Sequence, residues 1–306
     1  MIFYFIVKML GIFEMRKLVP KNYNEVEFNK LIFTKKDEIR DKLKLELLDI
    51  HNIKLRFADY QTYKTQLEYF ENILKSDYKK EDALKYNSLF NLYDSDSEDT
   101  KDLKKEIKEI SRTKCPYCGI SESSHLDHFL PRAKFPEFSI YSPNLIYVCS
   151  ICNSTYKGDD VVNSLGERKF FNPYFDNFIE DIQFLKCEIK VENGIYPEFK
   201  FYIEDLSSSN DYEYKVIRNH FEAMHLQTRY MEQIVKEEFK RFRNEYINKK
   251  SRIYYETSMD EIKGDIDKKL RGYQDENINN WEKVFWQSLK ESEECLNLIV
   301  NKVIPI

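Results

Sequence analysis

From Cys115 to Lys157 the chain reads CPYCGISESSHLDHFLPRAKFPEFSIYSPNLIYVCSICNSTYK, and this stretch concentrates the site chemistry of the sequence. Two Cys-x-x-Cys pairs stand at its ends and hold four of the six cysteines: Cys115, Cys118, Cys149 and Cys152. Each short pair directs two sulfur atoms at one point, and a zinc ion takes four thiolates at about 2.3 Å. The sequence therefore predicts one structural Zn²⁺ ion held by these cysteines. Four unrelated thiols and disulfides are the alternatives, and no secretory signal favours disulfides.

The insert between the two pairs predicts structure of its own. Its thirty residues, 119–148, exceed the spacing usual for zinc ribbons. Residues 124–130 predict a short strand that ends at Pro131, which has no N–H for a ladder. Residues 144–148 predict a second strand, rich in β-branched side chains. Residues 153–157 then suit a helical turn, so the expected order is strand, loop, strand, helix.

This order of residues resembles the HNH endonucleases, which share a ββα-metal site. The resemblance rests on the dyad Asp127-His128, on Asn144, and on Asn153 directly after the last cysteine. It implies that Asp127 and Asn153 hold a catalytic Mg²⁺ or Mn²⁺ ion. It also implies that His128 is the general base and that Asn144 is the structural asparagine that orients this histidine. The wider pattern resembles a subgroup from bacterial anti-phage defence systems, including the Septu nuclease subunit.

Two further residues are candidates for the same site. Lys157 follows Asn153 by four residues, where many members of the family have a lysine three residues on, and we expect a possible phosphate contact there. Neighbouring residues on a regular strand point to opposite faces. Asp127 and His128 can therefore share a site only if the strand end is distorted. His125 lies on the side of Asp127 and is the reserve candidate for either role.

The chemistry of these residue types agrees with the resemblance. Carboxylate and amide oxygens are hard ligands that suit Mg²⁺ or Mn²⁺. A neutral imidazole can take a proton from water near neutral pH. We expect a metal-dependent endonuclease that hydrolyses phosphodiester bonds of DNA. An RNA-cleaving HNH nuclease and a non-catalytic zinc module that binds nucleic acid or protein are the alternatives, because no base-reading element is recognisable.

The remaining sequence predicts a mostly helical α+β chain around this zinc-stabilised module. We expect an N-terminal helical region at 1–111, the nuclease module at 112–175, and a β-hairpin with a helical region at 176–306. Within the first region, 94–102 is acidic and predicts a solvated linker before a short helix at 103–110. After the module, strands at 182–191 and 195–203 would meet through Asn193-Gly194, because this pair tolerates the positive φ values of a hairpin turn.

Two helical patterns follow the hairpin. Residues 214–250 carry apolar side chains at helical spacing: Met231, Ile234, Val235, Phe239, Phe242 and Tyr246. The other face is basic and is either solvated or able to track phosphates: Lys236, Lys240, Arg241, Arg243, Lys249 and Lys250. Residues 260–306 are again helical, and a further apolar stripe there can pack internally or against a partner chain: Trp281, Val284, Phe285 and Leu289.

Charge and the first residues set the expected partners and location. The net charge is -5, so any DNA-binding face must come from local clustering of cations. Residues 1–13 are apolar but fall short of the roughly 20 residues that span a bilayer, and translation can start at Met1 or Met15. We expect a cytoplasmic protein without a membrane anchor. The Septu resemblance implies a protein partner, an ATPase subunit of a defence complex.

Overall fold

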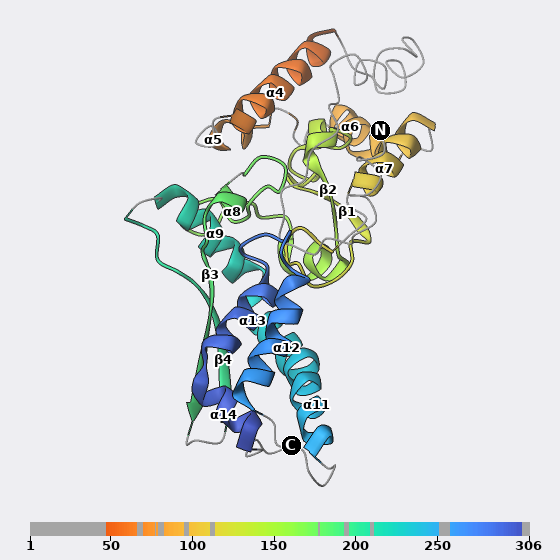
Figure 1. Cartoon of the computed structure of the whole chain (residues 1–306). Coiled ribbons are helices and arrows are strands. Elements are labelled where there is room, and N and C mark those ends of the chain that lie inside the picture. The colour runs from red at the N-terminus through yellow and green to blue at the C-terminus, as the bar shows by residue number, and fades with distance from the viewer. Residues whose placement is uncertain are drawn as a thin grey trace. The chain divides into compact units, whose positions relative to one another are not determined.

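The computed structural model describes residues 47–65, 70–76, 78, 83–94, 98–110, 114–176, 178–192, 196–208, 211–250 and 258–301. These residues form helices and two small antiparallel sheets of two strands each, so the expected mixture of helix and sheet is confirmed. They fall into two compact units (Figure 1). The module unit contains 47–117 and 121–176, and the C-terminal unit contains 178–301 with the short segment 118–120. The apolar segment 1–13 and the two candidate start residues lie outside the described residues.

The part of the module unit that the structure describes begins with four helices. They are α4 (Leu47–Thr65), α5 (Phe70–Ile73), α6 (Ala83–Leu92) and α7 (Glu98–Ile110). Helix α7 begins five residues before the expected 103, so the second half of the acidic stretch is its first turn and not a linker. Acidic side chains are favourable at a helix N-terminus because the helix dipole is positive there.

The centre of the module unit follows the expected order. Strand β1 (His125–His128) pairs antiparallel with β2 (Leu145–Val148), and η4 (Cys152–Lys157) is a helical turn of π type. Two short helices, η2 (Pro136–Phe138) and η3 (Ser142–Asn144), lie between the strands. Strand β1 ends before the predicted residue 130 because the Leu130 N–H donates to the Asn144 side chain, at 2.8 Å, and not to a strand partner.

An aromatic core supports these elements. Tyr60 and Tyr63 lie one helical turn apart on α4, and neither side chain is exposed. Tyr60 packs edge-on against Phe138, with ring centres 5.1 Å apart, and Tyr63 packs edge-on against Phe175 at 5.9 Å. Such pairs contribute about 0.5–1.5 kcal/mol each beyond their buried area. Helix α4 is therefore part of the core that surrounds the insert.

The C-terminal unit contains the predicted hairpin. After α8 (Phe178–Asp181), strand β3 (Leu185–Glu192) pairs antiparallel with β4 (Tyr196–Ile203), and Glu192 lies opposite Tyr196. The first strand begins three residues later than predicted because α8 runs to Asp181 and the Ile182 N–H still donates to the Phe178 carbonyl, at 3.1 Å. The Asn193-Gly194 turn itself lies outside the described residues.

Helices complete this unit. They are α9 (Asp211–Ala223), α10 (Leu226–Gln233), η5 (Ile234–Phe239), α11 (Lys240–Lys250), α12 (Met259–Arg271), α13 (Trp281–Glu291) and α14 (Glu293–Asn301). The predicted helical stretch 214–250 is interrupted at His225, which has a positive φ of 51°. Met231, the first residue of the apolar face expected at helical spacing, is 39% exposed. It follows Tyr230, which faces inward, and therefore points to another side of α10.

The apolar stripe of α13 and the basic face of the 214–250 stretch can also be located in the structure. The α13 stripe is buried inside the unit, and Trp281 stacks on Tyr230 with ring centres 5.5 Å apart. On the basic face, Arg243 is only 7% exposed, and Arg241 pairs with Glu238. The described part of this face is therefore not a continuous row of solvent-facing cations.

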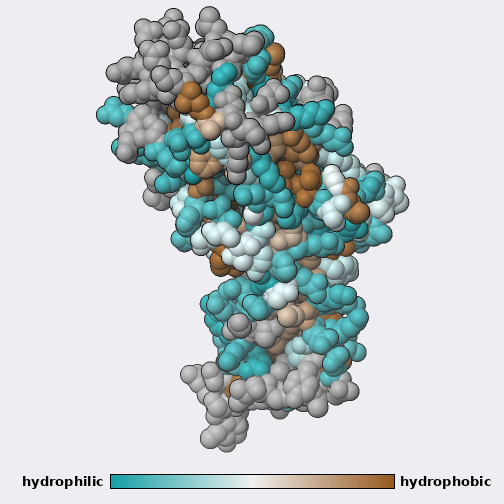
Figure 2. All heavy atoms as spheres, turned by 180° about the vertical axis from the view of Figure 1, so that it is seen from behind, coloured by the Kyte–Doolittle hydropathy of each residue, from teal (hydrophilic) through white to brown (hydrophobic). Residues whose placement is uncertain are grey.

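No helix among the described residues has the length and apolarity to cross a membrane. Figure 2 shows one face of the molecule, where apolar side chains lie in small patches separated by hydrophilic ones.

Candidate functional site

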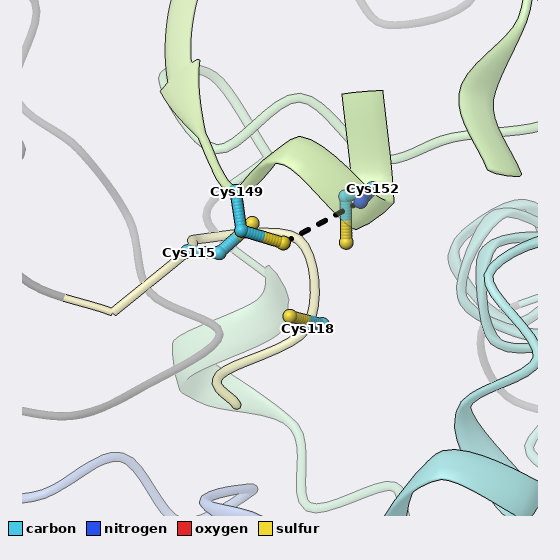
Figure 3. Close-up of side chains that lie close together, drawn as sticks. All are labelled: Cys115, Cys118, Cys149 and Cys152. Carbon is cyan, nitrogen blue, oxygen red and sulfur yellow. Dashed lines mark hydrogen bonds between the residues drawn. The ribbon is translucent and has the colours of Figure 1, made fainter. Parts of the chain in front are cut away.

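The four cysteines of the two pairs form a cluster that can hold a zinc ion (Figure 3). Their sulfur atoms all lie within 4.8 Å of one another, and all four residues are buried. A tetrahedral site with Zn–S bonds of about 2.3 Å places its sulfur atoms roughly 3.8 Å apart, so a small contraction closes the site. All six cysteines are free thiols, and the disulfide alternative is therefore not adopted.

Backbone N–H groups support this charge-dense cluster. The Cys152 N–H donates to the sulfur of Cys149, and the Ile120 N–H donates to the sulfur of Cys118, each at 3.4 Å. Gly119 turns the chain between these groups with a φ of 67°, which suits a residue without a Cβ atom. The donors offset the negative charge that thiolates bring to a buried site.

A pocket of about 360 Å³ lies in the module unit, beside the ββα elements. Four residues that the sequence analysis singled out line it: Asp127, His128, Asn153 and Lys157. Asp127 and His128 both reach this pocket although they are neighbours on β1, because His128 is the last residue of the strand. The Asp127 carboxylate, the His128 imidazole and the Asn153 amide, which the resemblance to HNH endonucleases assigns to one site, therefore line the same pocket.

Asp127 is held in one orientation by two partners. The Tyr117 hydroxyl donates to Asp127 Oδ2 at 3.0 Å, and the Lys157 ammonium lies 3.2 Å from Asp127 Oδ1. The carboxyl group is only 6% exposed. Burial raises the pKa of Asp127, and the nearby Lys157 charge opposes that rise. The Tyr117 hydroxyl and the Lys157 ammonium therefore fix the orientation of this carboxylate.

His128 has a defined tautomer. Its Nε2 atom lies 2.8 Å from the carbonyl oxygen of Ser139, which can only accept a hydrogen bond. Nε2 therefore carries the proton, and Nδ1 keeps its lone pair. Burial lowers the pKa of His128 to about 3, so the ring is neutral at pH 7. Nδ1 has no hydrogen-bond partner among the described residues, while the Tyr93 ring lies edge-on to the imidazole at 4.6 Å.

Asn144 lies in the core beneath the pocket and is fully buried. Its amide nitrogen donates to the carbonyls of Leu130, at 3.0 Å, and Phe138, at 3.3 Å. Its amide oxygen accepts from the Leu130 N–H and from the Tyr60 hydroxyl. The side chain thus pins both ends of the loop that leads to the Ser139 carbonyl, and its link to His128 runs through this loop.

The remaining candidates occupy different environments. Asn153 lines the pocket, and its side chain makes no hydrogen bond within the described part of the chain. The Lys157 ammonium is buried and also donates to the His128 carbonyl at 2.7 Å. His125 is exposed, bonds Ser124, and is absent from the pocket wall.

Three contributors to this site carry no local signal in the sequence. Tyr117 orients Asp127, the Ser139 carbonyl orients His128, and Arg132 lines the pocket. Tyr117 lies between the two cysteines of the first pair, where any side chain would fit the Cys-x-x-Cys pattern. A backbone carbonyl has no sequence signature. Arg132 follows Pro131 and could have been suspected only from its closeness to the dyad.

Comparison with known proteins identifies a relative from a bacteriophage. Over 193 residues the chain is 28% identical to Protein ea31 of Escherichia phage lambda, a match that covers 60% of this chain and 64% of that protein. The chain thus spans less than two thirds of its relative's length. No protein-family model matches the chain. No solved structure matches it.

Proposed function

We propose that this chain is a divalent-metal-dependent endonuclease of the HNH type that hydrolyses phosphodiester bonds of DNA. The observation that carries the proposal is the shared pocket of Asp127, His128 and Asn153, built on a strand–strand–helix segment whose two cysteine pairs, before β1 and at the junction of β2 and η4, form one cluster. Nothing in the name of the phage relative describes an activity. The proposal therefore rests on the geometry of the pocket and on the resemblance in sequence.

The donor set fits a hard divalent cation. Asp127 offers a carboxylate and Asn153 an amide oxygen, and both line one pocket. These are ligand types that Mg²⁺ and Mn²⁺ prefer, with the remaining positions left to water and phosphate. When bound, such an ion would stabilise the negative charge that develops on the phosphate and on the departing oxygen. Asp127 and Asn153 are the residues that would hold it.

His128 is the group that moves a proton. Its Nδ1 lone pair can accept a proton from an attacking water molecule, while the Ser139 carbonyl keeps Nε2 protonated and fixes the ring plane. Lys157 has a positioning role in this scheme, because its ammonium is occupied by Asp127 and by the His128 carbonyl. It holds the two residues of the dyad together.

A second candidate function is a non-catalytic zinc module that binds nucleic acid or protein. The observation that favours it is the Lys157–Asp127 ion pair, at 3.2 Å and buried, because this pair already compensates the carboxylate. In such a module Asp127 and His128 would stabilise the fold and take no part in catalysis. The two candidates differ in whether a divalent ion can join Asp127.

Cleavage by the purified chain tests the proposal directly. Supercoiled plasmid, single-stranded DNA and RNA are incubated with the protein in Mg²⁺, in Mn²⁺ and in a chelator. His128→Ala is the catalytic variant, and His125→Ala is its matched control because it removes the same side chain three residues away on the exposed end of β1. We expect metal-dependent nicking by the wild type and by His125→Ala only. Cleavage of RNA without cleavage of DNA would show that the substrate is RNA. No cleavage of any substrate in either metal would favour the non-catalytic module.

The cellular setting belongs to the same proposal. The Septu-like pattern supports a role as the nuclease effector of a bacterial anti-phage defence system, in the cytoplasm, with targeting supplied by a partner such as an ATPase subunit. Strong sequence-specific cleavage by the isolated chain would argue against this dependence on a partner.

A further inference from the structure

The pocket contains two cations with different availability. The Lys157 side chain is 1% exposed, and its ammonium contacts Asp127 and the His128 carbonyl, so the protein itself occupies this charge. The Arg132 side chain also lines the pocket but is 25% exposed. Among the described residues of the pocket wall, Arg132 is thus the cation that solvent can reach.

The Arg132 guanidinium is oriented by its neighbours. Its central carbon lies 4.3 Å from the centre of the Phe90 ring and 5.0 Å from that of Tyr93. Nη1 donates to the Phe90 carbonyl at 3.2 Å and to Asp94 Oδ2 at 2.8 Å. Nε and Nη2 have no hydrogen-bond partner within the described residues. One planar edge of the guanidinium therefore keeps its donors for a ligand.

We propose that Arg132 binds a backbone phosphate of the nucleic acid in this pocket, an inference that rests on the proposed nuclease function. The N–H groups of a guanidinium edge match two oxygens of one phosphate, and packing on aromatic rings fixes the plane before the ligand arrives. Asp94 does not cancel this charge, because its side chain is 56% exposed and screened by water. Arg132 thus takes the phosphate-contacting role that the sequence suggested for Lys157.

The same aromatic side chain connects the phosphate site with the dyad. Tyr93 lies under Arg132 and edge-on to His128, with centres 4.6 Å apart. Asp159 is the pocket-lining carboxylate that opposes an anion, and it is exposed. A phosphate held by Arg132 would therefore lie within the pocket and on the side of His128. Such a local phosphate site would explain how a chain with a net charge of -5 can bind a nucleic acid.

Binding measured without cleavage tests the inference. A labelled duplex oligonucleotide is titrated with the full chain in chelator, at several salt concentrations, for wild type, Arg132→Ala and Arg132→Lys. The matched control is Lys134→Ala, which removes a cation two residues away whose ammonium pairs with Asp160 outside the pocket wall. Zinc content and thermal melting of each variant establish that it is folded.

We expect Arg132→Ala to weaken binding roughly tenfold or more, because a hydrogen-bonded charge pair is lost. The slope of log K against log salt should fall by about 0.9, the value for one duplex phosphate. Arg132→Lys should keep the slope but bind less tightly than wild type, and Lys134→Ala should leave both unchanged. If Arg132→Ala has unchanged affinity and slope while the wild type cleaves DNA, the Arg132 inference is overturned and the nuclease proposal stands. Loss of binding in Arg132→Ala, with a wild type that cleaves nothing, supports the phosphate contact and overturns the nuclease.

Discussion

Replacing Lys157 with methionine separates the two candidate functions. The substitution keeps an unbranched side chain of similar length but removes the ammonium that lies 3.2 Å from Asp127 Oδ1 and 2.7 Å from the His128 carbonyl. Removing one partner of a buried ion pair costs about 3–5 kcal/mol. We expect the lower end, about 3 kcal/mol, because the Tyr117 hydrogen bond remains and the pocket admits water. For a unit of this size the melting temperature should fall by roughly 6–12 °C.

The response to metal is the decisive part of this experiment. If Asp127 is a metal ligand, an ion that replaces the lost ammonium should restore stability in the variant more than in the wild type. At ten times its Kd, an ion that binds only the folded state adds about 1.4 kcal/mol. Differential scanning calorimetry with and without Mg²⁺ measures both effects on zinc-loaded protein.

The control for this experiment is Lys134→Met. That side chain is half exposed and pairs with the exposed Asp160, so water screens the interaction and its loss should leave the transition in place. A Lys157→Met protein that melts with the wild type would refute the argument that the ammonium compensates a buried charge. An equal Mg²⁺ shift in both proteins would refute Asp127 as a ligand and favour the non-catalytic module.

Three further experiments test other parts of the molecule. His128→Ala should retain metal and DNA binding but cleave 10²–10⁴-fold more slowly, and added Mn²⁺ should rescue Asp127→Ala but not His128→Ala in a rate titration. Cys118→Ser should lose zinc, seen by elemental analysis, and should melt lower, because zinc binding is also folding free energy; a zinc-loaded variant would contradict the site. Arg56→Met should destabilise the chain by about 3–5 kcal/mol by stranding buried Glu137, and adding Glu137→Gln should restore most of it. Burial raises the pKa of Glu137 above its ordinary value of 4.5, so the buried carboxylate becomes neutral as the pH falls towards 4.5. The loss of unfolding free energy in Arg56→Met, measured in denaturant titrations, should therefore shrink over that range.

The sequence predicted those parts of the structure that depend on local pattern. The cysteine spacing predicted the cluster, because a Cys-x-x-Cys knuckle brings its two sulfur atoms together whatever surrounds it. Alternating side chains predicted β3 and β4. Helix α7 began earlier than expected because an acidic segment serves equally as a linker or as a first helical turn. Met231 shares the helical spacing of its apolar neighbours and is nevertheless exposed, because spacing alone does not say which side of a helix meets the core.

The contacts that give the pocket its chemistry depend on residues distant in sequence. Arg132 meets the Phe90 carbonyl across 42 positions, and the Lys157 ammonium meets the His128 carbonyl across 29. No periodicity encodes such pairs. The lysine illustrates the difficulty, because its position after Asn153 suggested a phosphate contact, whereas its burial makes it a partner of Asp127.

Contacts between protein groups hold the pocket residues in place. Removal of the proposed catalytic Mg²⁺ and removal of the proposed structural Zn²⁺ should therefore have different effects. The Tyr117 hydroxyl and Lys157 hold Asp127, while the Ser139 carbonyl holds His128. Asn144 fixes the loop that presents this carbonyl. These contacts join protein groups to one another, so we expect chelation of Mg²⁺ to stop cleavage without altering the fold. Tyr117, however, lies within the first cysteine pair, and loss of zinc would release the residue that orients Asp127. Zinc removal should therefore abolish both stability and activity, whereas removal of Mg²⁺ should abolish activity alone.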